Sequence, residues 1–240
     1  MVDTTAWDTN ARQRPERPPH GAGRRTRFDF TQYPDHGPGA DVLGIGPGSS
    51  VLDLGCGQGG NLAHLAALGA RAVGVDASPA QLKAAQALWN GAGLDLNLGD
   101  AVTYMENTDE DFDAVYSVFG AAWFTDPMVL LPAVRKALRP GGVFAFSQRP
   151  PVGNHYGCRS AHIGRSDGFD GSNGSNGSYG SGGSGGSGDA DPLVMQHWDY
   201  EPQAWLHMLT EHGFTAATAG VLAAPTGTRE IGTLLVRALC

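Results

Sequence analysis

The most constraining feature of the sequence is a short apolar run that ends at a cluster of glycines. Residues 51–54 read VLDL, and four of the six residues from Gly55 to Gly60 are glycine. An apolar run of this length is typical of a buried parallel strand. The glycines let the backbone turn sharply and approach a ligand that a Cβ would exclude. A helix is expected over residues 61–68, so the stretch predicts the first half of a βαβ unit in an α/β fold.

Asp53 narrows the kind of ligand that this turn would hold. The pattern D-x-G-x-G-x-G runs from Asp53 to Gly59 and places a carboxylate at the end of the strand. A dinucleotide site offers a helix N-terminus to a pyrophosphate, and a carboxylate there would repel phosphate but could hold a cation. The stretch resembles the first motif of the class I S-adenosylmethionine (SAM)-dependent methyltransferases, whose cofactor carries an ammonium and no phosphate. A glycine turn in some other α/β domain is the alternative.

The resemblance covers residues 51–239 and implies a complete fold. The family has a Rossmann-like seven-stranded sheet, mostly parallel with a C-terminal antiparallel hairpin, and helices on both faces. Further strands are expected over residues 70–78, 94–98, 112–119 and 143–147, with a closing pair over 214–224 and 231–239.

An acidic residue ends the second expected strand. Asp76 lies 21 residues after Gly55, where a carboxylate can accept hydrogen bonds from both hydroxyls of a ribose. A plain helix-start acid is the alternative, because Ser78-Pro79 opens the next helix. The resemblance implies that Asp100 and the backbone amide of Ala101 contact adenine. The full set expected at the cofactor is Tyr33, Asp53, Gly55, Cys56, Gly57, Asn61, Asp76, Ala77, Gln81, Asp100, Ala101, Ser117 and Val118.

The end of the fourth expected strand should border the methyl acceptor, because ligands of open α/β sheets bind outside the carboxyl ends of strands. Phe119, Trp123, Phe124 and Tyr156 are the residues expected to contact it. For Trp123 and Phe124, core packing of the next helix is the alternative. Members of the wider family that methylate exocyclic amino groups of DNA bases, or glutamine side chains, usually carry [DN]-P-P-[YF] here. This chain has S-V-F-G at 117–120, which argues against those activities.

The sequence does not single out a general base. SAM needs little activation, so the enzyme mainly holds a nucleophile in line with the C–S bond. A hydroxyl acceptor also needs a base, usually His. His36, His155 and His197 are expected around the pocket, and any one of them could serve. No His or Cys cluster suggests a catalytic metal, and none is expected.

The segment 28–48 differs in composition from its surroundings, with aromatic residues between glycines and prolines. In methyltransferases that the chain resembles, such a segment often folds over cofactor and substrate as a lid. Tyr33 and His36 would then face the site. The alternative is that Phe28, Phe30 and Tyr33 pack on the outside of the domain while His36 is solvated.

The remaining boundaries follow from composition. Residues 1–27 are rich in Arg and Pro and predict a disordered tail, and residues 49–240 form the SAM-dependent methyltransferase domain. Within it, 149–192 is an insertion whose residues 171–188 are almost purely Gly, Ser and Asn. That composition predicts a flexible loop without a chemical role.

The net charge and the number of cysteines limit which partners and which compartment are expected. A net charge of −8 argues against a broad nucleic-acid-binding surface. Three cysteines without a C-x-x-C pair argue against a disulfide framework. No apolar run reaches the ~18 residues of a membrane helix, and no signal-peptide core is present. A cytoplasmic protein without a membrane partner is expected, and its oligomeric state is not indicated.

These features predict an enzyme that uses SAM to methylate an O or N atom of a small, natural-product-like molecule. The arginine-rich tail leaves an RNA or peptide methyltransferase open. A SAM-binding protein on the same fold that does not methylate, such as another enzyme or a regulatory protein, would carry the same motifs.

Overall fold

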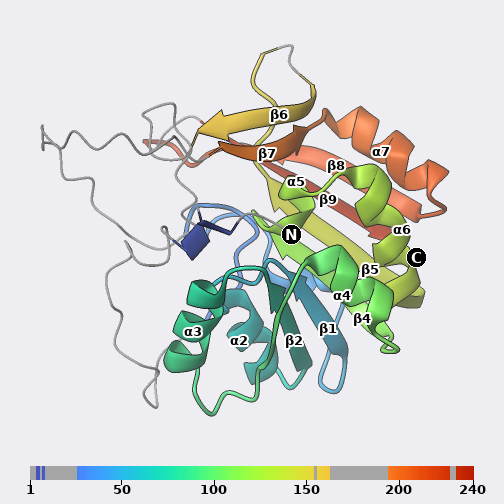
Figure 1. Cartoon of the computed structure of the whole chain (residues 1–240). Coiled ribbons are helices and arrows are strands. Elements are labelled where there is room, and N and C mark those ends of the chain that lie inside the picture. Colours follow the sequence, from blue (N-terminus) through green and yellow to red (C-terminus); the bar gives the residue numbers. More distant parts are fainter. Residues whose placement is uncertain (1–3, 6, 9–25, 154–155, 163–193, 228–230) are drawn as a thin grey trace, which may run out of the picture.

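Seven strands form one central sheet with the order β3-β2-β1-β4-β5-β9-β8 (Figure 1). The computed structural model describes residues 4–5, 7–8, 26–153, 156–162, 194–227 and 231–240. The strands of the central sheet are β1 (Ser50–Leu54), β2 (Arg71–Asp76), β3 (Asp95–Leu98), β4 (Phe112–Val118), β5 (Leu138–Gln148), β8 (Thr215–Leu222) and β9 (Thr233–Leu239).

The direction of the strands fixes where a ligand can bind. Strands β1 to β5 pair in parallel, and β9 runs antiparallel to both of its neighbours, β5 and β8. From β1 the chain proceeds outward to β2 and β3, then returns to place β4 on the other side of β1. This reversal leaves a crevice at the carboxyl ends of β1 and β4. The predicted seven-stranded α/β fold with a C-terminal antiparallel pair is confirmed.

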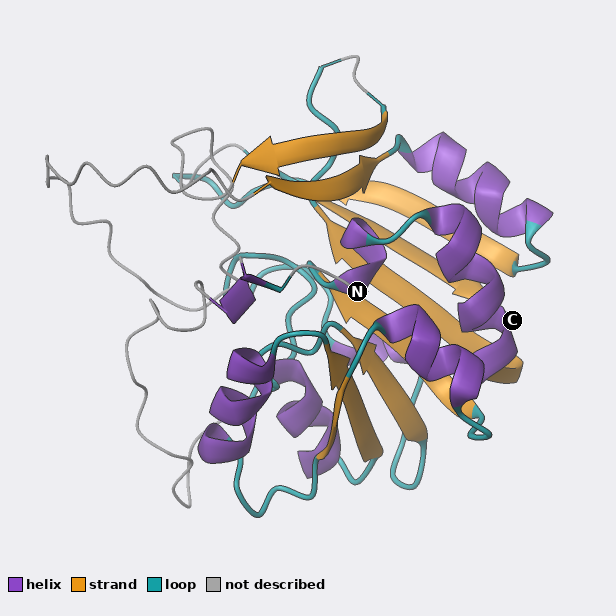
Figure 2. Ribbon diagram, in the orientation of Figure 1, coloured by secondary structure: helices purple, strands orange, loops and turns teal. Residues whose placement is uncertain are grey.

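Helices cover both faces of the sheet (Figure 2). One face packs against α4, α6 and α7 around a core that includes Leu52, Phe144 and the fully buried Trp205. The opposite face packs against α2, the 3-10 helix and residues 28–30. The helices are η1 (Ala40–Leu43), α2 (Gly60–Ala67), α3 (Pro79–Leu88), α4 (Ala101–Asn107), α5 (Ala121–Phe124), α6 (Pro127–Ala137) and α7 (Pro202–Glu211).

A two-stranded antiparallel sheet stands apart from the central one. Strands β6 (Gly157–His162) and β7 (Val194–Asp199) pair from Gly157 opposite Asp199 to His162 opposite Val194. The sequence predicted an insertion over 149–192 but no strand in it. Strand β6 forms because β7 buries Met195, His197 and Asp199 on one face and offers its backbone to a partner. The Gly/Ser-rich loop 171–188 lies outside the described residues.

Within the described ranges, none of the helices is long and apolar enough to cross a membrane.

Candidate ligand site at the carboxyl ends of β1, β2 and β4

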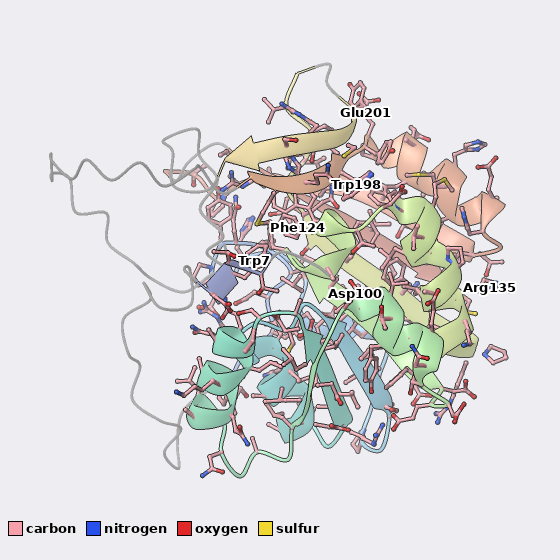
Figure 3. The ribbon with its side chains drawn as sticks, in the orientation of Figure 1. Trp7, Asp100, Phe124, Arg135, Trp198 and Glu201 are labelled. Atoms are coloured by element: carbon pink, nitrogen blue, oxygen red, sulfur yellow. The ribbon has the colours of Figure 1, made fainter. Side chains whose placement is uncertain are left out.

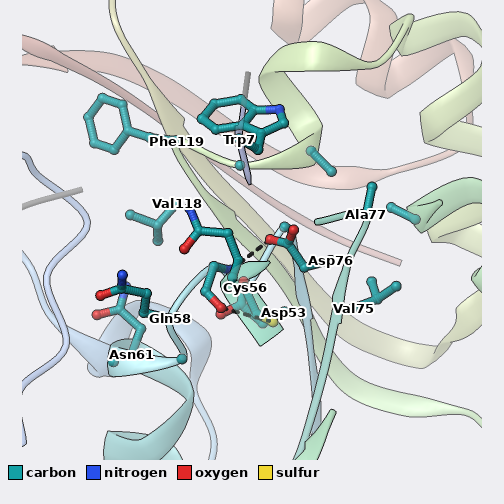
Figure 4. A pocket seen from close by; sticks show the side chains of 18 of the residues that line it. Trp7, Asp53, Cys56, Gln58, Asn61, Val75, Asp76, Ala77, Val118 and Phe119 are labelled. Atoms are coloured by element: carbon teal, nitrogen blue, oxygen red, sulfur yellow. Dashed lines mark hydrogen bonds between the residues drawn. The ribbon is translucent and has the colours of Figure 1, made fainter. Parts of the chain in front are cut away.

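A cavity opens where β1, β2 and β4 end (Figure 4). In the figure, Trp7 and Phe119 lie on one side of the cavity, and Asp53, Cys56 and Asp76 lie on the other. The cavity is lined by Trp7, Asp29, Thr31, Asp53, Gly55–Asn61, Val75–Ala77, Gln81, Leu88, Trp89, Gly99–Ala101, Val118–Ala121, Phe124 and Thr125.

The glycine turn that follows β1 needs glycine at Gly55 for two reasons. Its φ is +80°, and a Cβ would lie 2.6 Å from the backbone N of Ala121. The backbone of the turn after β1 therefore packs directly against the backbone at the start of α5, with no room for a side chain between them. Gly57 also has a positive φ, of +53°, but a Cβ there would meet nothing within 4 Å. The loop thus leaves open space beside Gly57, which suits close approach of a ligand.

Asp53 lies beneath this loop and is 4% exposed. Burial raises the pKa of its carboxyl to about 8, and the nearby Asp76 adds to the rise. The hydroxyl of Tyr116, whose Cα pairs with that of Asp53 across β1 and β4, opposes the rise. That hydroxyl is close to the carboxyl without meeting the geometry of a hydrogen bond. A cation bound in the cavity would favour the ionised carboxylate.

Asp76 at the end of β2 holds the loop together. Its Oδ2 accepts from the backbone N of Gly57 and its Oδ1 accepts from the backbone N of Ser78, both at 2.8 Å. Burial raises the pKa of Asp76, while these two backbone N–H groups oppose the rise. The carboxylate therefore has a structural role, which differs from the helix-start acid that the sequence left as the alternative, because Ser78 caps α3. Asp76 lines the cavity, and each of its carboxylate oxygens can accept a further hydrogen bond.

One buried acceptor in the cavity wall has no partner among the described residues. Gln81 is 6% exposed, and its Oε1 receives no hydrogen bond. Burying such an atom costs free energy unless a donor reaches it. Gln81 stands in the first turn of α3, where the side chain of Ser78 caps the helix by accepting from the backbone N of Gln81 at 3.2 Å. A ribose hydroxyl or an amino group in the cavity would supply the missing donor.

Asp100 and Ala101 lie at the start of α4, next to Gly99. The Oδ1 of Asp100 accepts from the backbone N and the Oγ1 of Thr103, at 2.9 and 3.1 Å, so Asp100 is the N-cap of the helix. Both residues line the cavity. Acidic residues thus lie at or just after the carboxyl ends of three neighbouring strands, as the sequence predicts.

The segment before the sheet also lines the cavity, with residues that the sequence did not single out. Asp29 and Thr31 line the cavity. The side chain of Asn61 accepts from the backbone N of Asp29 at 3.4 Å and donates to its backbone O at 3.3 Å. No local pattern indicates this contact, because the two residues are 32 positions apart.

Gln58 and Trp89 are two further lining residues that the sequence did not single out. The indole Nε1 of Trp89 donates to the backbone O of Gln58 at 2.7 Å. The end of α3 is thereby fixed to the glycine loop.

The wall at the end of β4 is aromatic. Phe119 has a φ of +48°, a region that bulky residues rarely adopt, and it lines the cavity with Phe124. Trp7 joins them, with ring centroids of Trp7 and Phe124 4.9 Å apart. Trp7 belongs to residues 1–27, predicted as a disordered tail. Most of that segment lies outside the described residues, but Trp7 lines the cavity and Asp8 accepts a hydrogen bond from Ser78.

Two predicted site residues lie behind the cavity wall. Ser117 is fully buried; its Oγ donates to the backbone O of Leu54 at 2.7 Å and accepts from the backbone N of Ala122 at 3.1 Å. It fixes β1, β4 and α5 relative to one another. Trp123 is 5% exposed, and its Nε1 donates to Oδ1 of Asp199 at 3.0 Å. Trp123 therefore packs in the interior, which was the alternative to contact with the acceptor.

Three more of the predicted site residues, Tyr33, His36 and Tyr156, do not line the cavity. The hydroxyl of Tyr33 donates to the backbone O of Ile231, and Nε2 of His36 lies 2.8 Å from the backbone O of Ala223, so both contact the β8–β9 connection. Tyr156 is exposed and its hydroxyl donates to Glu201. His155 lies outside the described residues.

His197 belongs to a buried polar cluster next to α5. It is 8% exposed, and its Nε2 lies 3.2 Å from Oδ2 of Asp199. Asp199 also meets Arg159, at 3.6 Å, and Trp123. The rings of Trp123 and His197 are 5.4 Å apart. The cluster joins β7 to the helix whose last residue, Phe124, lines the cavity.

The chain was compared with known proteins. Residues 52–146 match the model of the methyltransferase domain family. A "Probable phthiotriol/phenolphthiotriol dimycocerosates methyltransferase 2" of Mycobacterium ulcerans is 37% identical over 101 residues, or 41% of this chain and 39% of that protein. A ubiquinone biosynthesis O-methyltransferase of Cereibacter sphaeroides is 34% identical over 102 residues, or 40% of this chain and 39% of that protein. The chain spans about two fifths of the length of these relatives.

The likeness to solved structures covers more of the chain. The 1,6-didemethyltoxoflavin-N1-methyltransferase of Burkholderia thailandensis, with bound 1,6-didemethyltoxoflavin and S-adenosylhomocysteine (SAH), has a TM-score of 0.51 and 17% identity. The match covers 80% of this chain and 71% of that one.

The strand order and the glycine loop with its acidic partners define the fold of a class I SAM-dependent methyltransferase. Residues 52–146 match the model of the methyltransferase domain family, so the predicted resemblance to these methyltransferases is confirmed.

Proposed function

We propose that the protein is a SAM-dependent methyltransferase that methylates an O or N atom of a small molecule. One observation carries the proposal. The glycine loop, the carboxylate of Asp76 and the unpartnered Oε1 of Gln81 meet in one cavity at the carboxyl ends of the strands. An adenosyl group offers the hydroxyl and amino donors that these acceptors need.

Each side of the cavity has a role in this proposal. Asp76 accepts from the ribose hydroxyls while it keeps Gly57 in place. Gln81 takes one further donor of the adenosyl group, and Asp100 with the backbone of Ala101 borders the adenine. Asp53, whose pKa of about 8 reflects its burial, becomes ionised beside the positive charge of the cofactor.

Bound SAM would supply an electrophilic methyl group on a positively charged sulfur. The residues at the end of β4 then set the direction of attack, because Phe119 and Phe124 line the cavity beside the glycine loop. With SAM bound, the acceptor O or N would bond to the methyl carbon as the C–S bond breaks, the electron pair of that bond would stay on sulfur to give SAH, and the proton of the acceptor would pass to solvent. These aromatic side chains would keep water away from the methyl group, so that the acceptor and not water acts as the nucleophile.

A small acceptor is supported by the comparisons. The Cereibacter relative is named an O-methyltransferase and the Burkholderia structure holds 1,6-didemethyltoxoflavin, so both names concern small molecules. The aromatic wall of Trp7, Phe119 and Phe124 suits a flat or apolar acceptor.

The test is product formation with a panel of acceptors. The protein is incubated with SAM and, in turn, phenols, carboxylic acids, amines and N-heterocycles, and SAH and methylated product are measured by mass spectrometry. SAH formed with at least one acceptor, reduced in Asp76→Ala at limiting SAM and kept in the surface variant Asp111→Ala, is the expected result. SAM binding without methylated product from any of these classes would instead favour the non-methylating alternative.

A further inference from the structure

A short helical turn near the N-terminus docks onto the cavity from far away in the sequence. The backbone N of Asp8 donates to the backbone O of Thr4 at 2.9 Å, and Oγ1 of Thr4 donates to Oδ2 of Asp8. Neither Trp7 nor Asp8 belongs to a hydrophobic core cluster. The turn is therefore held by the contacts of a few side chains.

Asp8 attaches this turn to the start of α3. Its Oδ1 accepts from the Oγ of Ser78 and, at 3.4 Å, from the backbone N of Ala80. Ser78 is fully buried, so the hydroxyl that reaches Asp8 is itself held firmly. The negative charge of Asp8 contributes to raising the pKa of Asp76. Asp8 thus adds charge next to the carboxylate proposed to bind the ribose.

Trp7 attaches the same turn to α5. Its ring meets that of Phe124 edge-on, at a centroid distance of 4.9 Å and an interplanar angle of 75°. Figure 3 shows Trp7 and Phe124 as neighbours at the centre of the molecule, and Figure 4 places Trp7 near Phe119 over the cavity. Because α3 follows β2 and α5 follows β4, the turn spans the cavity from one side to the other.

We propose that Trp7 is a specificity residue for the charged, methyl-bearing end of the cofactor and that Asp8 is its positioning residue. The inference rests on the proposed function. An aromatic ring attracts a cation placed near its face, and the end of β4 is where the methyl group is transferred in that proposal. SAM carries a positively charged sulfur and SAH a neutral one. Trp7 therefore favours SAM over SAH, which lets the product leave.

The experiment measures the affinities of SAM and SAH for the full chain by calorimetry. Trp7→Ala is expected to weaken SAM binding about tenfold, or about 1.4 kcal/mol, because the aromatic–cation contact is lost. SAH binding is expected to change less than about twofold. Trp7→Phe keeps a ring and should restore most of the preference. Asp8→Ala releases the anchor and should shift the ratio in the same direction as Trp7→Ala.

Two controls separate a local effect from misfolding. Trp198→Ala changes a partly exposed tryptophan of β7 outside the cavity lining, and it should leave both affinities unchanged. The unfolding temperature of ligand-free Trp7→Ala should stay within about 2 °C of the original, because Trp7 is outside the core.

The outcomes are distinguishable. Equal weakening of SAM and SAH in Trp7→Ala would overturn the assignment to the charged sulfur, and unchanged affinities would overturn any role of Trp7 in cofactor binding. If the original protein binds neither SAM nor SAH, it is the proposed function itself that fails.

Discussion

The two sides of the cavity are built in different ways. The side proposed to bind the cofactor, called the cofactor side, comes from short contiguous stretches: the glycine loop follows β1, Asp76 is the last residue of β2, and Asp100 lies two residues after β3. The other side, called the acceptor side here because it is proposed to face the acceptor and the methyl-bearing end of the cofactor, is assembled from α5 and the N-terminal turn, with α5 held by the β6–β7 hairpin. Backbone geometry at strand ends determines the first side, whereas long-range side-chain contacts determine the second. The difference predicts that the two sides respond differently to mutation.

The largest effect is expected on the cofactor side from Gly55→Ala. A Cβ would lie 2.6 Å from the backbone N of Ala121 at a φ of +80°, so strain and overlap add. We expect the free energy of unfolding to fall by about 3 kcal/mol, measured by urea denaturation. Gly46→Ala is the matched control, because a Cβ there meets nothing within 4 Å, and its change should stay below about 0.5 kcal/mol. Equal stability of the two variants would contradict the close backbone approach.

Asp199 holds the acceptor side together, because it contacts Trp123 of α5 as well as His197 and Arg159. Asp199→Ala leaves the buried Nε1 of Trp123 without this acceptor and removes the contacts to His197 and Arg159. We expect a loss of about 2–3 kcal/mol in the free energy of unfolding. Asp199→Asn keeps an acceptor oxygen and should lose less. SAH affinity should change less than about twofold in Asp199→Asn if the two sides are separable, and a large loss would show that they are not.

Asp76→Ala tests the cofactor side by affinity. SAM binding should weaken by about 1–3 kcal/mol, because buried hydroxyls lose their acceptor. Asp111→Ala, an exposed carboxylate outside the cavity lining, is the control and should bind SAM normally. Unchanged SAM affinity in Asp76→Ala, measured by calorimetry on protein with a normal unfolding temperature, would remove the ribose assignment.

Asp53 gives the cofactor side a dependence on pH. Its pKa of about 8 in the folded chain lies above the value of 3.8 expected when unfolded, so the folded state binds its proton more tightly. The contribution to stability is therefore full below pH 4 and is lost as the pH rises through 8. The free energy of unfolding, measured without ligand from pH 5 to 9, should fall more steeply than in Asp53→Asn. Parallel profiles would show that the carboxyl is already ionised.

The smallest effect is expected from His36→Ala. The imidazole Nε2 contacts the backbone O of Ala223 at the β8–β9 connection, and His36 does not line the cavity. Stability should change by about 0.5 kcal/mol or less, and SAH production with an accepted substrate should be unchanged. A loss of turnover at normal SAM affinity would restore His36 as a general base.

The sequence predicted the cavity-lining residues of the proposed cofactor side more fully than those of the proposed acceptor side, for physical reasons. A positive φ at Gly55 and a carboxylate at Asp76 are local requirements, so they leave local patterns. The pairing of Asn61 with the backbone of Asp29 spans 32 residues and leaves none. Trp7 lies near an arginine- and proline-rich stretch that indicates disorder, yet its ring reaches Phe124.

The strands show the same limit. Core strands such as β1 and β4 were predicted from their apolar runs. Strand β6 was missed because its partner, β7, lies more than thirty residues further along the chain and the pairing joins polar segments. Tyr33 was expected at the site from its place before the sheet, but its hydroxyl reaches Ile231 instead. Side-chain direction in an irregular segment depends on contacts that sequence spacing does not encode.

The most direct measurement is calorimetric titration of the original protein with SAM and then with SAH. Binding of both with dissociation constants of about micromolar, corresponding to about −8 kcal/mol, is the predicted result. Absence of binding by either compound would contradict the proposed function, and the glycine loop would then serve a different ligand.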